Sequence, residues 1–463
     1  MAMNRAWRVT RGAWRAVGLA SVLAIGVNVT AASGSARRDR EGVPAAPRAA
    51  RHAPRDLSDS LTTQFSVSGV QVIHRRSTAS DVVAVSLYLL GGTRQLTPET
   101  QGIEALVLAA SEYGTRAYPG PAVRRARART GSRMVITADA DWTVFGFQGI
   151  KQEFDSSWAI FAERLMRPTL DQASVTLVRD QLLGDVRNRK NTPDALVHYL
   201  ADSLAYADHP YVLEPTGTEQ SLARLTAADL RRYHSAQLVT SRMLLVVVGD
   251  VPREKIERLV AGTVGRLPKG SYTWTLPPTP PERAGTMVVR HRVIPTNYIL
   301  GYFTGPAASS PDYPAFRVAV AILSARLHDA IRERNALSYA AYAPFLERAA
   351  PAGGMYATTG SPERVISIMR GELTSLQTDE LSDDGLDDFV EQFITDYYTE
   401  NETNAAQADW LARAHLYRGD YTAAYRFMDD LRHVSAADIR RVARQYMKNV
   451  RFAYVGDGAK VSE

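Results

Sequence analysis

The stretch from Gly102 to Thr115 reads G-I-E-A-L-V-L-A-A-S-E-Y-G-T, an apolar run between a leading glycine and a trailing Gly-Thr. The apolar run predicts a buried helix, and a Gly-Thr pair is a common helix stop. Ala105, Leu108 and Ala109 occupy the first, fourth and fifth places of a window inside this helix. Their side chains offer no lone pair to a metal ion or a proton. This helix decides how the rest of the chain is interpreted.

A sequence repeat divides the chain on the C-terminal side of this helix. L-T-A-A-D-L-R-R-Y at 225–233 recurs as V-S-A-A-D-I-R-R-V at 434–442, and each copy precedes an apolar strand that ends in Gly-Asp. The glycines of these Gly-Asp pairs, Gly249 and Gly456, are 207 residues apart. A register kept over such a distance indicates one module present twice.

Each copy of the repeat also carries a helix start. Thr226 and Ser435 are expected to cap their helices, because a hydroxyl at this place accepts a hydrogen bond from a free backbone N–H. The aspartates three positions further on, Asp229 and Asp438, take the capping-box position usually filled by Glu or Gln. The sequence therefore predicts two equivalent helices, each leading into a buried strand.

The order of predicted elements is the same in both halves: strands, a hairpin or strand pair, helices and a final strand. It predicts an α+β fold of two homologous sandwich-like halves, each an antiparallel-rich sheet packed by helices. In the first half we expect strands at 70–74, 82–90, 134–138 and 143–149, and helices at 156–166, 174–190, 193–206 and 225–235. In the second half we expect strands at 286–290, 298–304, 339–345 and 354–359, and helices at 315–332, 362–377, 383–397 and 404–417.

The N-terminus predicts export. Residues 1–36 combine an arginine-rich start, an apolar run and small residues at the end, which is typical of a secretory signal. The expected location is the periplasm or the exterior. The apolar run is shorter than the roughly 20 residues of a membrane span, so membrane attachment is expected only if the signal stays uncleaved.

The remaining boundaries follow from composition. Residues 37–57 are rich in Arg, Pro and Ala and predict a flexible leader. A first domain is expected at 58–267 and a second at 285–463, with a linker at 268–284 that contains five prolines.

Composition excludes several classes of function. The chain of 463 residues has no cysteine, which excludes disulfides, a thiolate metal site and a cysteine nucleophile. Its formal net charge is +6, but residues 1–57 carry more than this surplus and the remaining body is near −1. Nucleic-acid binding therefore loses its main support. The sequence also lacks a G-x-S-x-G elbow and phosphate-binding glycine motifs.

The helix at 102–115 resembles the zinc helix of the insulinase/pitrilysin family of metallopeptidases, in which H-x-x-E-H stands between the same glycine and Gly-Thr. There, two histidines on one helical face hold the metal and the glutamate acts as general base. The resemblance places Ala105, Leu108 and Ala109 at these three positions, and Asp185 where a later helix supplies the remaining glutamate ligand. It implies a fold like that of the mitochondrial processing peptidase, with no cofactor in this chain.

No other metal site is predicted. The nine histidines include no pair three or four residues apart, so lone structural roles are expected for them. Glu104 and Glu112 flank the degenerate positions, and they are interpreted as solvated charges. Gly353 and Gly354 are interpreted as a turn between strands.

A second resemblance lies in I-R-E-R-N-A-L-S-Y, at residues 331–339. The family's second half carries an Arg/Tyr pair in such a pattern, with glycine where this chain has Ser338. The resemblance implies that Tyr339 donates its phenol to the oxygen that becomes negative during peptide hydrolysis, and that Arg332 holds a substrate carbonyl. The alternative is a helix-end cation and a strand packing residue.

Together these resemblances imply one half of an active site. Short family members include heterodimers in which one subunit carries H-x-x-E-H and the other supplies the Arg/Tyr pair. We therefore expect this chain to be the zinc-free subunit, inactive alone, with a homologous zinc-bearing peptidase subunit as partner. Unfolded peptides are expected to add to a sheet edge in a shared chamber. An inert scaffold, as in the family's respiratory-complex core subunits, and a peptide-capture protein are the alternatives.

Overall fold

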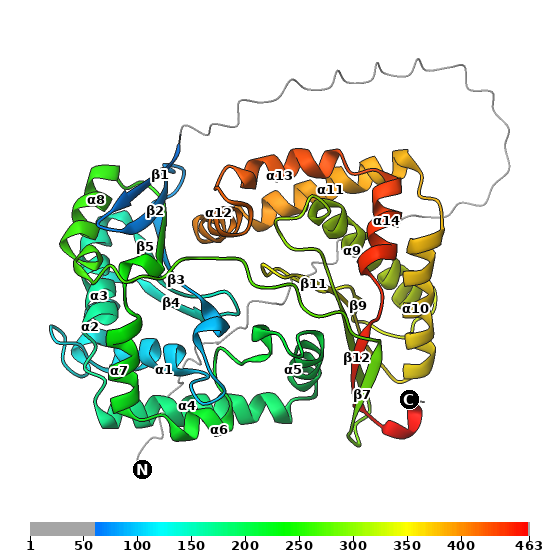
Figure 1. Ribbon diagram of the computed structural model, residues 1–463, viewed down its shortest axis with the longest axis horizontal. Helices are drawn as coiled ribbons and strands as arrows, with labels where there is room; N and C mark the ends of the chain where they lie inside the picture. The colour runs from blue at the N-terminus through cyan, green and yellow to red at the C-terminus, as the bar shows by residue number, and fades with distance from the viewer. Residues whose placement is uncertain (1–60, 462–463) are drawn as a thin grey trace, which may run out of the picture. The chain divides into compact units, whose positions relative to one another are not determined.

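The computed structural model describes residues 61–461, apart from the side chains at 383 and 384. The predicted signal and leader, residues 1–36 and 37–57, lie outside this range. Within it, no helix has both the length and the apolar character needed to cross a membrane. The described chain contains two mixed sheets packed by helices (Figure 1).

The first sheet has the strand order β1-β2-β6-β3-β5-β4. Its strands are β1 (Thr62–Val67), β2 (Val70–Arg75), β3 (Val82–Leu90), β4 (Arg133–Ala138), β5 (Trp142–Ile150) and β6 (Met243–Val248). The second sheet has the order β10-β11-β8-β12-β7, with β9 also paired to β11. Its strands are β7 (Thr286–His291), β8 (Asn297–Thr304), β9 (Ala341–Tyr342), β10 (Phe345–Leu346), β11 (Ala352–Thr359) and β12 (Arg451–Gly456).

The two sheets share one pairing scheme. The final strand of each half, β6 or β12, pairs in parallel with an early strand, β2 or β7, and antiparallel with the next, β3 or β8. The antiparallel pairs β3–β5 and β8–β11 then extend each sheet. The predicted duplication and the α+β class are confirmed.

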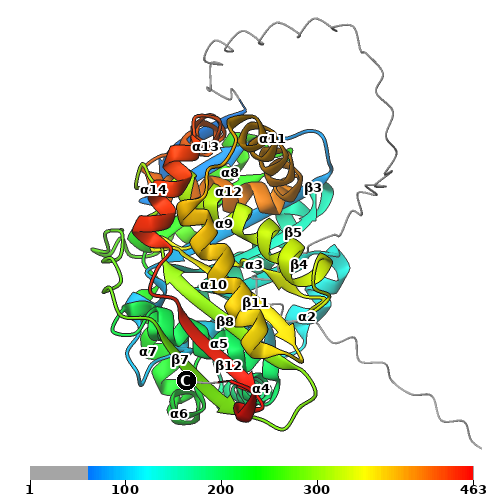
Figure 2. The same ribbon diagram turned by 90° about the vertical axis from the view of Figure 1, so that its right-hand side faces the viewer.

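Helices surround both sheets. Those of the first half are α1 (Ile103–Ala110), α2 (Ala122–Thr130), α3 (Phe154–Met166), α4 (Gln172–Asn191), α5 (Pro193–Ala205), α6 (Glu219–Arg224), α7 (Ala227–Gln237) and α8 (Arg253–Gly262). Those of the second half are α9 (Tyr313–Leu327), α10 (Pro362–Thr378), α11 (Asp383–Glu400), α12 (Asn404–Arg418), α13 (Ala423–Arg432) and α14 (Ala436–Tyr446). Figure 2 shows α10 lying across the second sheet.

Each half lends one helix to the other half. Helix α5 of the first half packs on β8 and β12, where Val197 and Ala201 meet Tyr302 in one buried cluster. Helix α12 of the second half packs on β3 and β6, where Leu411 joins Tyr88 of the first sheet in another (Figure 1). The opposite face of the first sheet is covered by helices of its own half. Both sheets are therefore buried on two faces, one of which depends on the other half.

A buried carboxylate joins the halves. Asp141, 2% exposed, precedes β5. Its oxygens accept hydrogen bonds from the Tyr211 hydroxyl, the Tyr417 hydroxyl at 2.8 Å and the Ala349 backbone N–H at 3.0 Å. Tyr417 and Ala349 belong to the second half, so this turn is a junction as well as a hairpin.

The repeated motif folds as predicted. Thr226 accepts a hydrogen bond from the Asp229 N–H, Ser435 accepts one from the Asp438 N–H, and both capping boxes are complete. The Gly of each Gly-Asp ends a final strand where a side chain has no room. A Cβ at Gly249 would approach Val83 of β3, and a Cβ at Gly456 would lie 2.3 Å from the Asn297 side chain of β8. The two contacts fall on equivalent strands.

Several details differ from the predictions. The helix expected to run to Arg332 ends at Leu327 and continues as a π-helical turn, η7 (His328–Glu333). The strand expected at 339–345 is replaced by the short β9 and β10. Gly353 and Gly354 are not a turn: they lie inside β11, where a Cβ on Gly354 would come within 2.7 Å of the Gly301 carbonyl oxygen. Glycine is needed there because two strands approach closely.

Candidate functional site

Helix α1 carries the three degenerate positions, and every residue of it is buried. Gly102 caps its start in the left-handed conformation at φ 83°, with no room for a Cβ because Gly217 lies against it. Ala105 is 0% exposed and Leu108 is 2% exposed. Leu108 packs into the cluster beneath the first sheet, and Ala109 packs with side chains of α4 and α7. The helix that has the metallopeptidase frame thus fills its metal positions with packed hydrocarbon.

Asp185 lies on α4, which packs against α1. Its side chain is on the exposed side of α4, whereas its neighbours Leu182 and Val186 face the α1 cluster. Partial desolvation raises the pKa of Asp185, and the nearby Arg189 opposes this. Within residues 61–461, no group of three or more His, Asp or Glu side chains is arranged to hold a metal ion. Alanine, leucine and one exposed carboxylate do not fit a zinc site.

Glu104 is not the solvated charge that was expected, because a distant arginine pairs with it. The Glu104 carboxylate lies 3.0 Å from Nη2 of Arg242 and accepts a hydrogen bond from the Tyr233 hydroxyl at 3.0 Å. Burial lowers the pKa of Arg242, but Glu104 outweighs it and the net shift is upward. Burial also raises the pKa of Tyr233. Charge pairing therefore locks the start of α1 to α7 and to the strand that follows it.

The end of α1 is held by a second buried arginine. Arg164 donates from Nε to the Ser111 hydroxyl at 3.1 Å and from Nη2 to the Leu108 carbonyl at 3.4 Å. Glu112 is 3.9 Å from Arg164 and 2.7 Å from Arg127, so it too is paired. Desolvation lowers the pKa of Arg164 to about 10. A cation at the C-terminal end of a helix satisfies its last carbonyls and its dipole.

The Arg/Tyr pair lies in the second half, on the chain that follows α9. Arg332 belongs to η7, and its guanidinium is 3.5 Å from the carboxylate of the adjacent Glu333. Tyr339 lies in the loop between η7 and β9 and is 91% exposed. The loop is anchored around it, because Leu337 N–H donates to the Ile331 carbonyl and the Ser338 hydroxyl bonds both backbone groups of Ala340. The phenol is thus presented to solvent from a fixed backbone.

This arrangement differs from the expectation in one respect. The sequence placed Tyr339 at the start of a strand, whereas the strand begins at Ala341. The π-helical turn was not foreseen, and π-turns are frequent at functional sites because they insert an extra residue into a helix. Turn η7 packs against α9, α10 and β9 of its own half. Arg332 and Tyr339 therefore come from one structural unit, and the degenerate positions from another.

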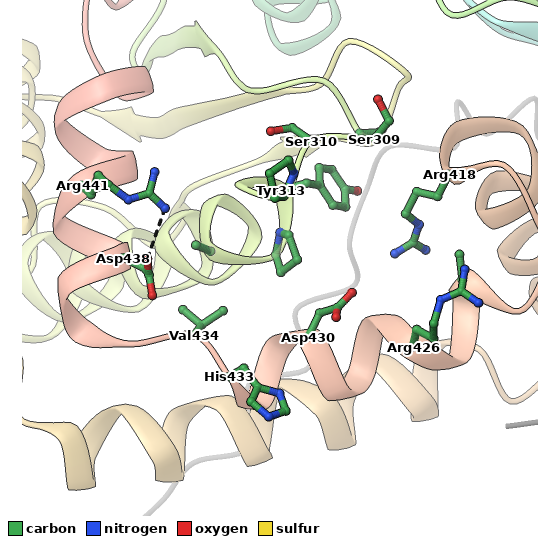
Figure 3. Close-up of a pocket in the computed structure, with 15 residues that line it drawn as sticks. Ser309, Ser310, Tyr313, Arg418, Arg426, Asp430, His433, Val434, Asp438 and Arg441 are labelled. Carbon is green, nitrogen blue, oxygen red and sulfur yellow. Dashed lines mark hydrogen bonds and ion pairs between the residues drawn. The ribbon is translucent and has the colours of Figure 1, made fainter. Parts of the chain in front are cut away.

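A separate pocket of about 540 Å³ lies in the second half, between the start of α9 and helices α13 and α14 (Figure 3). Arg441 is paired with Asp312 at 2.8 Å and Asp438 at 3.2 Å. Arg418 and Asp430 point toward the same space from α12 and α13. Desolvation raises the pKa of Asp430, and Arg418 opposes this. None of the predicted site residues lines this pocket.

Comparison with known proteins agrees with the duplicated fold. Residues 71–218 match the insulinase family (peptidase family M16), and residues 224–393 match the family's inactive domain. The two matches fall on the first half and on the adjoining part of the second. The chain belongs to the insulinase family of peptidases.

Relatives within this family have varied descriptions. Human mitochondrial cytochrome b-c1 complex subunit 1 is 23% identical over 56% of this chain and 55% of its own length, so the chain matches about half of that relative. The uncharacterized zinc protease YmxG of Bacillus subtilis is 19% identical over 82% of this chain and 93% of its own length. A crystal structure of a peptidase M16 inactive domain from Pseudomonas fluorescens superposes with a TM-score of 0.78 at 18% identity, covering 87% of this chain and 100% of that one.

Proposed function

We propose that this chain is the zinc-free subunit of a heterodimeric zinc metallopeptidase. The observation that carries the proposal is helix α1, which keeps the frame of the family's metal helix but buries Ala105, Leu108 and Ala109 in its place. A chain with this helix has no residue to hold the hydrolytic metal. Zinc and its ligands are then supplied by a homologous partner, and the chain alone is inactive. That some relatives are named as subunits of larger assemblies supports a partner in general.

The chain's contribution is made by the loop after η7. Tyr339 is 91% exposed, so its hydroxyl is free to meet a group on another molecule. As a peptide carbonyl is attacked, its oxygen gains negative charge, and a neutral phenol O–H stabilises that charge without ionising. Arg332 donates N–H groups to a neighbouring substrate carbonyl, once its weak contact with Glu333 at 3.5 Å is released. Both residues position and polarise the substrate.

The setting of this activity is also part of the proposal. The signal-like residues 1–36 favour an exported protein that acts in the periplasm or outside the cell. Its substrates are unfolded peptides, which add a strand to an open sheet edge. The runner-up is an inert scaffold, because cytochrome b-c1 complex subunit 1 is among the relatives. In that case Tyr339 has no role in turnover.

The test mixes the purified chain with a homologue that carries an intact H-x-x-E-H helix. We expect peptide hydrolysis by the mixture and none by this chain alone, and Tyr339→Phe is expected to lower kcat by about a hundredfold. Tyr398→Phe is the matched control, because Tyr398 is also exposed, at 51%, and lies on α11. Unchanged turnover with Tyr339→Phe supports the scaffold. Zinc and proteolysis in the pure chain overturn both readings.

A further inference from the structure

The segment around α2 is the most basic part of the described chain. Six arginines and no acidic residue occur between positions 116 and 133, although the body of the protein is near −1 overall. The six are Arg116, Arg124, Arg125, Arg127, Arg129 and Arg133, here called the α2 arginines. Such a local excess is not explained by the composition of the whole protein.

Most of the α2 arginines have no acidic partner. Arg127 is paired with Glu112 at 2.7 Å, and Arg124 lies 5.0 Å from the centre of the Tyr113 ring. In the part of the chain that the structure describes, Arg116, Arg125, Arg129 and Arg133 make no ion pair, and all four are exposed. Arg125 and Arg129 are one turn apart on the same helical face, where like charges repel and cost a few tenths of a kcal/mol. The fold gains nothing from this arrangement.

The inner side of α2 shows why the arginines point outward. Val123, Ala126 and Thr130 are buried, and the first two pack with Ile160 of α3. These three positions form one face of the helix, so the remaining positions face solvent. The helix therefore presents a positive surface on a rigid base.

The α2 arginines lie next to an open sheet edge. Arg133 is the first residue of β4, and β4 is the last strand in the first sheet, with no strand on its outer side among residues 61–461. Helix α1 packs against β4, and α2 packs against the short 3-10 helix η2 (Ser111–Tyr113) that ends α1. Backbone groups that can pair with an extended chain are thus beside unpaired guanidinium groups.

We infer that the α2 arginines select acidic extended peptides at the β4 edge. The peptide backbone pairs with β4, and its Asp and Glu carboxylates receive N–H donors from Arg125, Arg129 and Arg133. A planar guanidinium suits this role because it donates two parallel hydrogen bonds to one carboxylate. The inference rests on the proposed peptide handling and deepens it by naming the class of substrate.

The test measures binding of fluorescent peptides by anisotropy, with the full chain alone and mixed with a zinc-bearing homologue. One peptide is rich in Asp and Glu, and its counterpart has Asn and Gln at the same positions. We expect the acidic peptide to bind about tenfold more tightly at low salt, with the preference shrinking as salt shortens the screening length. The double variant R125E/R129E is expected to abolish the preference. The control R258E/R266E makes the same charge change on α8 and the 3-10 helix η6 (Val264–Arg266), at exposed arginines without an ion pair.

The outcomes separate this inference from the proposed function. Equal binding of the acidic and amide peptides overturns the inference and leaves peptide handling intact. If neither peptide binds, both fail. A preference lost equally in R125E/R129E and R258E/R266E assigns it to overall charge and overturns the inference. Tighter binding of phosphatidylglycerol vesicles or a single-stranded oligonucleotide than of the acidic peptide, lost in R125E/R129E, overturns it in favour of that other polyanion.

Discussion

The helices α1 and α9 occupy equivalent places in the two halves and have opposite fates. Each follows the strand that pairs antiparallel with the final strand, and each packs against the helix before that strand, α7 or α14. Helix α1 has 8 residues, all buried, and both its ends are closed by arginines. Helix α9 has 15 residues and continues through η7 into an exposed loop.

This difference shows how a duplicated fold can divide its labour. In the first half, the positions that carry metal ligands in the family now serve packing. In the second half, the equivalent helix delivers Arg332 and Tyr339 to the surface. If the comparison is right, substitutions in α1 act on folding and substitutions after η7 act on turnover. The following experiments test this separation.

The largest effect is expected from restoring the metal motif. Leu108→Glu places a carboxylate without a partner in the cluster beneath the first sheet, and we expect a loss of about 3 kcal/mol or more in the free energy of unfolding. Urea denaturation measures it. Leu177→Glu on α4 is the control, because Leu177 is 46% exposed and should change stability by about 0.5 kcal/mol or less. Wild-type stability of L108E, or stoichiometric zinc in A105H/L108E/A109H, would show that α1 is a dormant metal site.

The buried ion pair at the start of α1 comes next. Glu104→Gln leaves the Arg242 guanidinium buried without its counter-charge, which is expected to cost about 3–5 kcal/mol. Adding Arg242→Met should recover part of the loss, since the stranded charge is then gone. Glu257→Gln is the control, because it breaks the exposed pair with Arg253 and should cost about 1 kcal/mol or less. A small effect of E104Q in chemical denaturation would mean that the pair does not hold α1.

Acid should weaken the first half before the second. Burial lowers the pKa of His74, His198, His209 and His234 in the first half, and of His415 in the second. Above the ordinary pKa of about 6.5 these groups are neutral in both states, so they have no effect. As pH falls below it, the unfolded chain binds more protons and stability drops until the lowered folded pKa is passed. Hydrogen exchange near pH 5.5 should show first-half amides losing protection first; equal loss in both halves would contradict this.

The smallest effect sharpens the comparison from its symmetric side. Thr226→Ala and Ser435→Ala each remove one capping box, and we expect losses of about 1 kcal/mol that agree within a few tenths. Ser361→Ala is the control, because Ser361 starts α10 without a side-chain capping bond and should be near neutral. Thermal unfolding followed by circular dichroism suffices. Clearly unequal losses would show that the repeat is conserved in sequence but not in energetics.

The sequence predicted best where the signal is local. The run V-V-A-V-S-L-Y-L-L at 82–90 is β3 to the residue, because dense β-branched and apolar residues favour a buried strand. The capping boxes needed only residues three positions apart. Helix α2 was missed because A-V-R-R-A-R-A-R-T offers only Val123 and Ala126 as an apolar stripe. The strand at 339–345 was wrong in extent: Pro344 lies in this segment and lacks the N–H that a strand interior needs.

The candidate site shows the same limit. The apolar character of Ala105, Leu108 and Ala109 could be read directly, and the exposure of Tyr339 could not, because it depends on the π-helical turn. Glu104 was misjudged since its partner Arg242 is 138 residues away. A single sequence gives no sign of such a distant pairing. The roles of Arg332 and Tyr339 in turnover remain predictions.

The exchange of α5 and α12 between the halves has a consequence for the integrity of the chain. A protease that nicked the proline-rich connection at 268–284 would produce two fragments that stay associated, since each holds a helix that covers the other's sheet. Either fragment expressed alone would leave an apolar sheet face open to water and would aggregate. The duplicated modules are thus mutually dependent, and truncation at the repeat boundary is not a route to a functional half-molecule.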